Sequence, residues 1–464
     1  MGRNGQLKLG LFLVQAGFHE GAWRDPSVPV NGGVDIDHFA QLAALAERAA
    51  FHFLFLADSP SVLERDHKHI ARVSRNDGFE PITLLSALSS RTREIGLVAT
   101  ATTTYNQPYH LARTFASLDH LSNGRAGWNI VTSGLRYEAP NFGDKELPEH
   151  DKRYERAREF VDIVKGLWDT WEDDAFIRDK QSGIFVDTTK LHLPNHRGDY
   201  FSVRGPLNIA RPPQGYPVLV QAGASEAGIK FAAEVGEVVF TAAPSLEGGK
   251  RQYATLKEKA RTLGRADDQI LIMPGIIPIV GKTRLEASEK LQRLHSNIHI
   301  DVAIGLAERM LGFVVDLRSI NFDSFVPEAL PQTNSTQSTQ KLLLDMAARL
   351  QLTWRQLIHS LSDSKGQLLV VGTPDEIANI MVNTFDERAA DGFNILPAMV
   401  PNGLKDFIDL VIPELRRRGQ FRAEYSGQTL RENLGLKRPL NRVSVAGAGH
   451  PPQTTRDPIG FVKN

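Results

Sequence analysis

Short apolar runs alternate with amphipathic stretches along most of the chain. Apolar residues at a spacing of three to four predict helices between these runs, for example over 37–51 and 150–171. This alternation is typical of repeated βα units and predicts an α/β fold, a (β/α)8 TIM barrel with long insertions. The eight predicted strands are at 7–14, 53–58, 95–102, 126–132, 217–223, 238–243, 270–281 and 392–399.

Two stretches are too long to be ordinary connections in such a barrel. Residues 172–216 follow the fourth helix, and residues 285–365 separate the seventh strand from its helix. Thr373 and Pro374 then predict the start of that helix, as an N-cap followed by a first-turn proline. Insertions of this kind usually build a substrate pocket, a lid or an oligomer contact.

The domain organisation follows from the same pattern. We expect one TIM-barrel domain over 1–418 and a C-terminal extension over 419–464 that wraps the barrel or hangs free. Within the second insertion, the polar segment 331–340 (PQTNSTQSTQ) predicts a mobile loop tip.

Composition narrows the function classes. The chain has 464 residues, 54 basic and 54 acidic, so no overall charge draws it to nucleic acid or an anionic membrane. It has no cysteine, which excludes disulfides, thiolate metal sites and a cysteine nucleophile and fits a reducing cytoplasm. The start of the chain lacks the pattern of a secretory signal, and the most apolar run is too short to span a membrane.

Polar residues at the C-terminal ends of barrel strands are the first candidates for chemistry. Strand one leads into Phe18, His19, Trp23 and Arg24, strand two ends in Asp58, and strand three ends in Thr100. Strand four carries Asn129 inside an apolar run. An unpaired amide in a core costs roughly 1–3 kcal/mol, so Asn129 either props the barrel or faces a polar ligand.

Two neighbouring helix starts predict an anion site. His150 and Tyr154 lie one turn apart at the start of the fourth helix, and Ser225 opens the fifth. Together with free backbone N–H groups they suit a phosphate ester. Taken singly, Ser225 is also typical of a plain N-cap and His150 of a surface or cap residue.

Other motifs are weak. The run GASEAG lacks the Lys and Ser/Thr of a P-loop and the last glycine of G-x-S-x-G, which disfavours a serine hydrolase. No nicotinamide-binding unit is visible. The histidine pairs lack a carboxylate at matched spacing, so we predict no metal site.

Three longer runs resemble a known superfamily. They are ATTTYNQPYHLARTFASLDHLSNGRAGWNIVTS (101–133), EHDKRYERAREFVDIVKGLWDTW (149–171) and VLVQAGASEAGIKFAAE (218–234). They are similar to the bacterial luciferase-like superfamily, in the branch with nitrilotriacetate, EDTA and dibenzothiophene sulfone monooxygenases. The ending over 390–436 resembles that branch too.

The resemblance implies a two-component monooxygenase on a TIM barrel. Such proteins take reduced FMN (FMNH2) from a separate NAD(P)H-dependent flavin reductase and use O2 to oxidise a small substrate, with C–N or C–S cleavage. A homodimer or homotetramer is expected from the same family. The implied flavin contacts are Asp58, Thr100, His150, Tyr154 and Ser225, with Asn129 as a further contact and Ala224 where the branch often has serine.

The same resemblance implies which residues lie near the substrate. We expect His19 to be a proton donor or substrate anchor, because imidazole changes charge near neutral pH. Phe18, Trp23 and the 285–365 insertion are the expected walls, and Arg24 suggests a carboxylate or sulfonate. The alternatives are a deazaflavin-dependent oxidoreductase on the same barrel, a flavin-binding protein without turnover, and a metal-dependent hydrolase.

Overall fold

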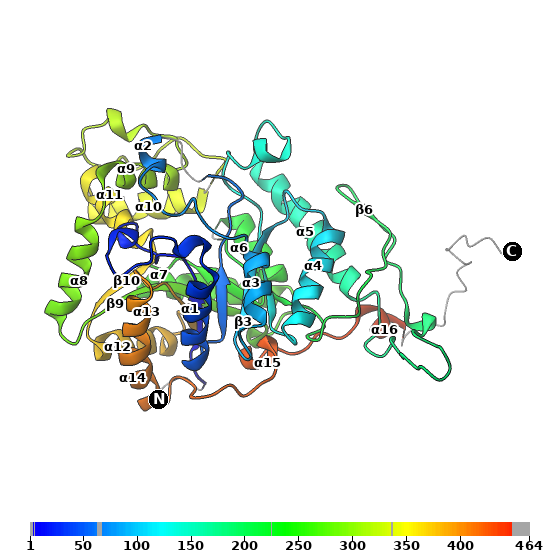
Figure 1. The fold of residues 1–464 in the computed structure, drawn as a ribbon. Helices are drawn as coiled ribbons and strands as arrows, with labels where there is room; N and C mark the ends of the chain where they lie inside the picture. The colour runs from blue at the N-terminus through cyan, green and yellow to red at the C-terminus, as the bar shows by residue number, and fades with distance from the viewer. Residues whose placement is uncertain (1–2, 4, 63–66, 224, 336, 448–464) are drawn as a thin grey trace.

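The eight predicted strands close into a barrel. This computed structural model describes residues 3, 5–62, 67–223, 225–335 and 337–447. The strands pair in parallel around a ring, and the first strand pairs with both the second and the last (Figure 1). In ring order they are β1 (Lys8–Phe12), β2 (Phe53–Leu56), β3 (Gly96–Thr102), β4 (Ala126–Val131), β7 (Val218–Gln221), β8 (Val238–Thr241), β9 (Leu271–Val280) and β11 (Gly392–Ile395).

Helices cover the outside of this ring, which confirms the predicted (β/α)8 architecture. Their starts follow the capping chemistry, because Ser225, Ser245 and Thr373 each accept a backbone N–H of the helix they precede. The covering helices are α1 (Ile36–Arg48), α3 (Pro81–Ser89), α4 (Pro108–Leu121), α5 (His150–Trp168), α6 (Glu226–Val235), α7 (Leu246–Thr262), α12 (Pro374–Asp386), α13 (Asn402–Asp406), the π-helix Phe407–Val411 and α14 (Ile412–Arg417).

The 285–365 insertion is not a bare connection, which corrects the expected order of elements. A helix begins directly after β9, and three more follow around a small core that includes Leu311, Leu343 and Leu357. Figure 1 shows most of this subdomain above the strand ends. The four helices are α8 (Arg284–Ser296), α9 (Ile300–Met310), α10 (Gln337–Leu350) and α11 (Trp354–Ser364).

A ninth strand in the barrel sheet, β10 (Leu368–Gly372), was not predicted. β9 pairs with β8 through its first residues and with β11 near its middle. Its last residues, Ile276–Val280, extend beyond the ring and pair with β10. Because β9 spans ten residues, its far end leaves an edge that the short run LLVVG can cover.

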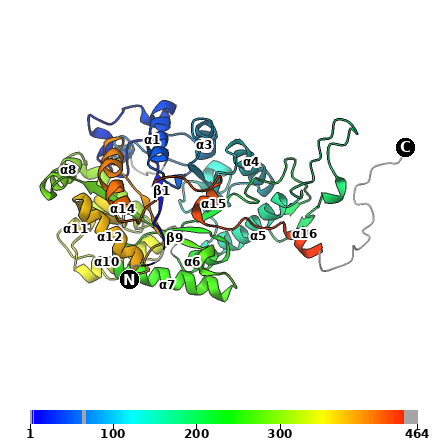
Figure 2. The ribbon, with the colours of Figure 1, turned by 90° about the horizontal axis from the view of Figure 1, so that it is seen from below.

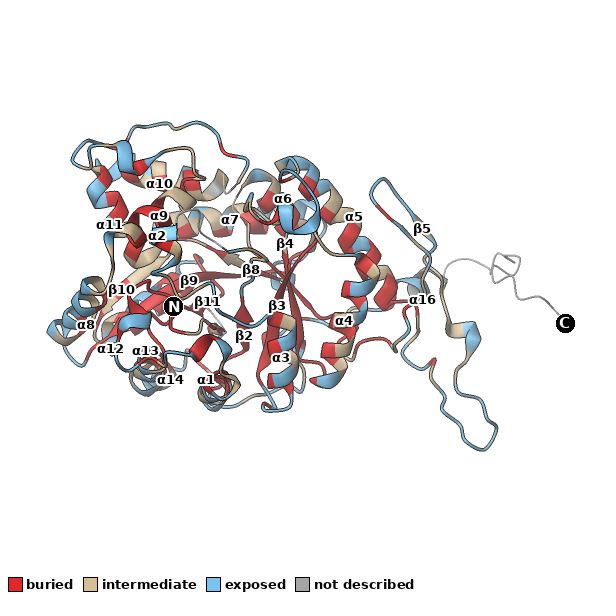
Figure 3. Cartoon of the chain, turned by 45° about the horizontal axis from the view of Figure 1, so that its top comes forward, coloured by how far each residue is buried: buried red, intermediate tan, exposed pale blue. Residues whose placement is uncertain are grey.

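The other insertion forms an arm. Its two short strands, β5 (His196–Arg197) and β6 (Ser202–Val203), pair antiparallel. Figure 3 shows the arm projecting from the barrel with mostly exposed residues. Shorter elements elsewhere are α2 (His67–Ile70) and the 3-10 turns Ala22–Arg24, Gly32–Val34, Ala139–Phe142, Thr188–Lys190, Asp267–Gln269 and Leu317–Ser319.

The described portion of the C-terminal extension closes the lower end of the barrel. Helix α15 (Leu430–Leu434) lies across that end when the molecule is viewed from below (Figure 2). Leu430 and Leu434 pack against interior side chains such as Phe55 and Val218. A Cβ at Gly96 would lie 2.5 Å from a methyl carbon of Leu430 and 2.9 Å from the backbone oxygen of His52, so glycine permits this close approach.

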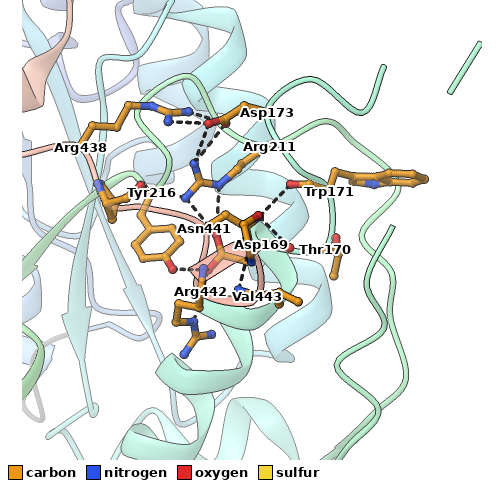
Figure 4. A network of polar contacts seen from close by, with 12 residues as sticks. Asp169, Thr170, Trp171, Asp173, Arg211, Tyr216, Arg438, Asn441, Arg442 and Val443 are labelled. Carbon is orange, nitrogen blue, oxygen red and sulfur yellow. Dashed lines mark hydrogen bonds and ion pairs between the residues drawn. The ribbon is translucent and has the colours of Figure 1, made fainter. Parts of the chain in front are cut away.

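A buried polar network holds the rest of this segment, up to α16 (Arg442–Gly447), against the end of α5 (Figure 4). Asp169 accepts hydrogen bonds from Arg211 Nε at 3.0 Å and from the backbone N–H of Arg442 at 3.2 Å. Asn441 donates to the backbone oxygen of Asp169 at 3.1 Å. The extension up to residue 447 therefore wraps the barrel, and residues 448–464 lie outside the described residues.

No helix in the described ranges is both long and apolar enough to cross a membrane.

Leu430→Ala is expected to lower the free energy of unfolding by about 2–5 kcal/mol, because it leaves a cavity among interior side chains. Gln428→Ala, at an exposed position of the same segment, should change it by less than about 0.5 kcal/mol. Urea unfolding followed by circular dichroism measures both. Equal effects of the two substitutions would contradict the role of α15 as a plug.

Candidate active site

A cavity of about 270 Å³ lies at the C-terminal ends of β2, β3, β4 and β7. It is lined by five of the predicted cofactor contacts, and the 285–365 insertion adds Ser335 and Gln337 to its wall. The barrel mouth is where catalytic groups gather in this architecture. The predicted residues in its lining are Asp58, Thr100, His150, Tyr154 and Ser225.

The two helix starts meet at one end of this cavity. A Cβ placed at Gly228 would lie 2.9 Å from Tyr154 Oη and 3.1 Å from Ser225 Oγ, so both hydroxyls flank the first turn of α6. The rings of His150 and Tyr154 are 5.0 Å apart. Ser225 Oγ accepts the Gly228 N–H at 3.1 Å, so the serine is an N-cap as well as a cavity residue.

Thr100 and Asn129 form a linked pair on neighbouring strands. Asn129 Nδ2 donates to Thr100 Oγ1 at 2.8 Å, and Thr100 Oγ1 donates to the Leu56 carbonyl at 2.7 Å. Thr100 lines the cavity, whereas Asn129 lies buried behind it. Among the described residues, Asn129 Oδ1 has no hydrogen-bond partner. Asn129 thus positions Thr100 with one end of its amide.

Asp58 lies in an acidic section of the wall. Partial burial in the cavity, together with the charges of Glu80 and Glu138, raises its pKa to about 6. Glu138 lines the same cavity and accepts a hydrogen bond from Ser59 Oγ at 2.9 Å. Asp58 is therefore ionised at pH 8 and protonated at pH 5.

Three buried polar residues in the wall were not predicted from the sequence: Glu138, Arg153 and Gln221. Each has a side-chain atom without a hydrogen-bond partner among the described residues: Glu138 Oε2, Arg153 Nε and Gln221 Oε1. A buried polar atom without a hydrogen-bond partner destabilises the folded protein unless a ligand or a water molecule binds to it. Only Gln221 carried a sequence clue, as a polar residue at the end of a predicted strand.

The polar segment 331–340 is not a free loop tip, which corrects that expectation. Asn334 Oδ1 accepts the backbone N–H of His150 at 3.2 Å, and the Asn334 carbonyl accepts Arg153 Nη2 at 2.8 Å. Ser335 donates to the Gly134 carbonyl. Its polar side chains complete a helix start and the cavity wall, whereas polarity alone had suggested a solvated tip.

His19 lies at the mouth but outside the lining of this cavity. Its side chain is buried, and its Nδ1 accepts the Gly21 N–H at 3.1 Å, so the neutral ring carries its proton on Nε2. Burial lowers the pKa of His19, against the opposing effect of Asp363. His19 Nε2 is 3.6 Å from Asp363 Oδ1, which also contacts His295.

These three side chains are close enough together to hold a metal ion. The hydrogen bond from Gly21 occupies the Nδ1 lone pair, so Nε2 presents a proton rather than a lone pair toward Asp363. This arrangement suits a hydrogen-bond donor better than a metal ligand.

The other predicted substrate residues are dispersed. Phe18 packs edge-on against Phe12, whereas Trp23 is 38% exposed and donates to the Arg72 carbonyl. Arg24 is exposed and donates to the Asn297 carbonyl at 2.8 Å. None of the three lines the cavity, and the predicted contact Ala224 lies outside the described residues.

A second cavity of about 450 Å³ adjoins the first. It lies at the ends of β1 and β2 and shares Asp58 and Ser59 with its neighbour. Phe12, Leu56 and Phe79 give it apolar walls, and Arg75 contributes a cationic group.

The polar lining of the first cavity suits the phosphate and the hydroxyl chain of a flavin mononucleotide. At one end, Tyr154, Ser225 and the start of α6 offer donors for a phosphate. Elsewhere in the lining, the unpartnered oxygens of Glu138 and Gln221 can accept hydrogen bonds from a chain of hydroxyl groups.

The chain is similar in sequence to known proteins over most of its length. The family model "Luciferase-like monooxygenase" matches residues 12–392. The chain is 48% identical to N-acetyl-S-(2-succino)cysteine monooxygenase of Bacillus subtilis (strain 168), covering 94% of this chain and 98% of that protein. It is 44% identical to nitrilotriacetate monooxygenase component A of Aminobacter aminovorans, covering 96% and 99%.

The fold is also similar to that of a solved structure. A crystal structure of riboflavin lyase with modified FMN and substrate riboflavin aligns with a TM-score of 0.86 and 33% identity. The alignment covers 97% of this chain and all of that one.

Asp58→Asn is expected to stabilise the protein more at pH 8 than at pH 5. The folded-state pKa of Asp58, about 6, lies above its usual value of 3.8, so folding favours the protonated form and stability falls as pH rises between these values. The amide removes this dependence. Thermal unfolding of both proteins at the two pH values measures the difference, and an equal gain at both would contradict the raised pKa.

Proposed function

The chain belongs to the luciferase-like monooxygenase family, and we propose that it binds reduced FMN in the first cavity and uses O2 to oxidise a small organic substrate. A separate NAD(P)H-dependent reductase supplies the reduced flavin, and the oxidation leads to C–N or C–S cleavage. The observation that carries the proposal is the meeting of Tyr154 and Ser225 at the first turn of α6. The relative named as component A of its monooxygenase supports a separate reductase.

The phosphate of the cofactor would lie between the starts of α5 and α6. There the Tyr154 and Ser225 hydroxyls can donate to phosphate oxygens, with His150 beside them. The positive end of the α6 dipole favours a dianion at the same point. The hydroxyl chain would then run along Glu138 and Gln221 toward Thr100 and the acidic wall at Asp58.

When bound, reduced flavin supplies the electrons that activate O2. The protein's own contribution is to orient that cofactor and to exclude water. Asn334 and Ser335 tie the insertion to α5 and to the loop after β4, which closes one side of the cavity. The second cavity, across Asp58, would hold the substrate.

His19, at the barrel mouth, would serve as a substrate anchor or proton donor. The hydrogen bond from Gly21 fixes its ring with the Nε2 proton toward Asp363, which supports the role of a donor. Because His19 lines neither cavity, its effect on substrate requires a shift of the ring or of Asp363.

We also propose that the protein forms a homodimer or homotetramer. The arm supports it, because Ile177, Ile184 and Phe185 are each at least half exposed there.

Ser225→Ala and Tyr154→Phe are each expected to weaken FMN binding by about tenfold and to leave riboflavin binding unchanged. Each removes a hydroxyl that donates to the phosphate, which riboflavin lacks. Quenching of flavin fluorescence measures both affinities. Ser245→Ala is the matched control, because it removes a comparable cap on α7 away from the cavity. An equal loss for riboflavin would place the phosphate elsewhere.

His19→Ala is expected to retain binding of reduced FMN while losing most product formation. Product is measured by mass spectrometry with a generic flavin reductase and a panel of amines, thioethers, sulfones and sulfonates. His299→Asn, at a more exposed position that caps α9, serves as the control. Unchanged turnover in His19→Ala would remove this residue from the mechanism.

A further inference from the structure

The second cavity is placed to hold the substrate beside the cofactor, and its walls indicate a class of substrate. This inference rests on the proposed function, because it assigns the first cavity to the flavin. The two cavities share Asp58 and Ser59, so a molecule in the second would reach the flavin across that edge. The described lining includes Leu13, Phe39 and Leu84, which suit a short carbon chain.

Arg75 is the one cationic side chain among the described residues that line this cavity. Its guanidinium is fixed in place from behind. Nη2 donates to the Phe18 carbonyl at 2.8 Å, and Nε lies 3.2 Å from Glu20 Oε1. The guanidinium also lies 5.5 Å from the centre of the Phe18 ring. An arginine held in this way presents a preorganised edge to an incoming anion.

Arg75 shares its acidic partner with a second cation. Lys365, from the end of the insertion, contacts the same Glu20 carboxylate at 2.8 Å, so two cations share one buried acid. Burial, followed by the charge of Arg75, lowers the pKa of Lys365 to about 7, although Glu20 opposes both effects. A carboxylate in the second cavity would give Arg75 an acidic partner that it does not share with Lys365.

We propose that the substrate is a small thioether or amine that carries carboxylate groups, and that one carboxylate pairs with Arg75 in the second cavity. The chain of the substrate then follows the apolar wall, which places its heteroatom toward Asp58 and the flavin. Two relatives at 48% and 44% identity are named for substrates of this kind, a succino-cysteine and nitrilotriacetate. Arg75 takes the role that the sequence had suggested for Arg24.

The test compares acids with their esters on the flavin-free protein. The probes are nitrilotriacetate and (carboxymethylthio)succinate, each beside its trimethyl ester, with binding measured by titration calorimetry. We expect the acids to bind at least about tenfold more tightly than the esters, since the esters lose the charge-assisted pairing. Equal affinity of acid and ester for the unaltered protein would overturn the proposal, without need of any variant.

Variants then locate the site. Arg75→Gln should weaken binding of the acids by about tenfold or more, Arg75→Lys by less, and neither should change the affinity for the esters. Arg72→Gln is the control, because Arg72 is nearby in sequence and half exposed but does not line this cavity. Undiminished acid binding by a folded Arg75→Gln would overturn the assignment.

FMN binding is measured on the same variants to separate this inference from the proposed function. Arg75→Gln should keep the FMN affinity of the unaltered protein, because Arg75 lies outside the first cavity. Loss of acid binding with intact FMN binding supports the substrate site. Absence of FMN binding in the unaltered protein would refute the proposed function, whatever the result with the acids.

Discussion

Closure of the parallel sheet through β9 is the constraint on which the rest of this molecule depends. β9 pairs with β8 on one side and with β11 on the other, so the ring has no open edge between them. Because every strand runs in the same direction, all eight C-terminal ends meet at one rim. Residues as distant in sequence as Asp58 and Gln221 are thereby brought to a single cavity. At the other end, Leu430 and its neighbours fill the barrel.

The 285–365 insertion completes the wall of the first cavity at the rim. Asn334 completes the start of α5, and Lys365 reaches Glu20 in the loop after β1. Ser335 and Gln337 of the insertion line the first cavity, and Lys365 contacts the same acid as Arg75, which lines the second. The acidic wall of Asp58 and Glu138 lies beside the first cavity, and the cationic cluster at Arg75 lies beside the second. Asp58 lies on the edge that the two cavities share, so the acidic side chain borders both of them.

Much of the fold and some of the site could be predicted from sequence because they depend on local patterns. Each barrel strand lies within a predicted apolar run, and the Thr373 cap was recognisable from a few adjacent residues. Tyr154 and Ser225 could be found because each lies near the start of a helix at the rim. β10 was missed because a run of five residues becomes a strand only where β9 extends beyond the ring.

The sequence by itself determined the barrel, its family and the helix starts that would face a phosphate, since periodicity and capping act over a few residues. Only the tertiary structure decided which side chains share a cavity. Trp23 and Arg24 follow β1 closely yet turn away to the Arg72 and Asn297 carbonyls, whereas Arg75 and Glu138 line the cavities. The physical reason is that loop positions are fixed by contacts between segments distant in the chain. The sequence of such a loop does not show which distant segments it will contact.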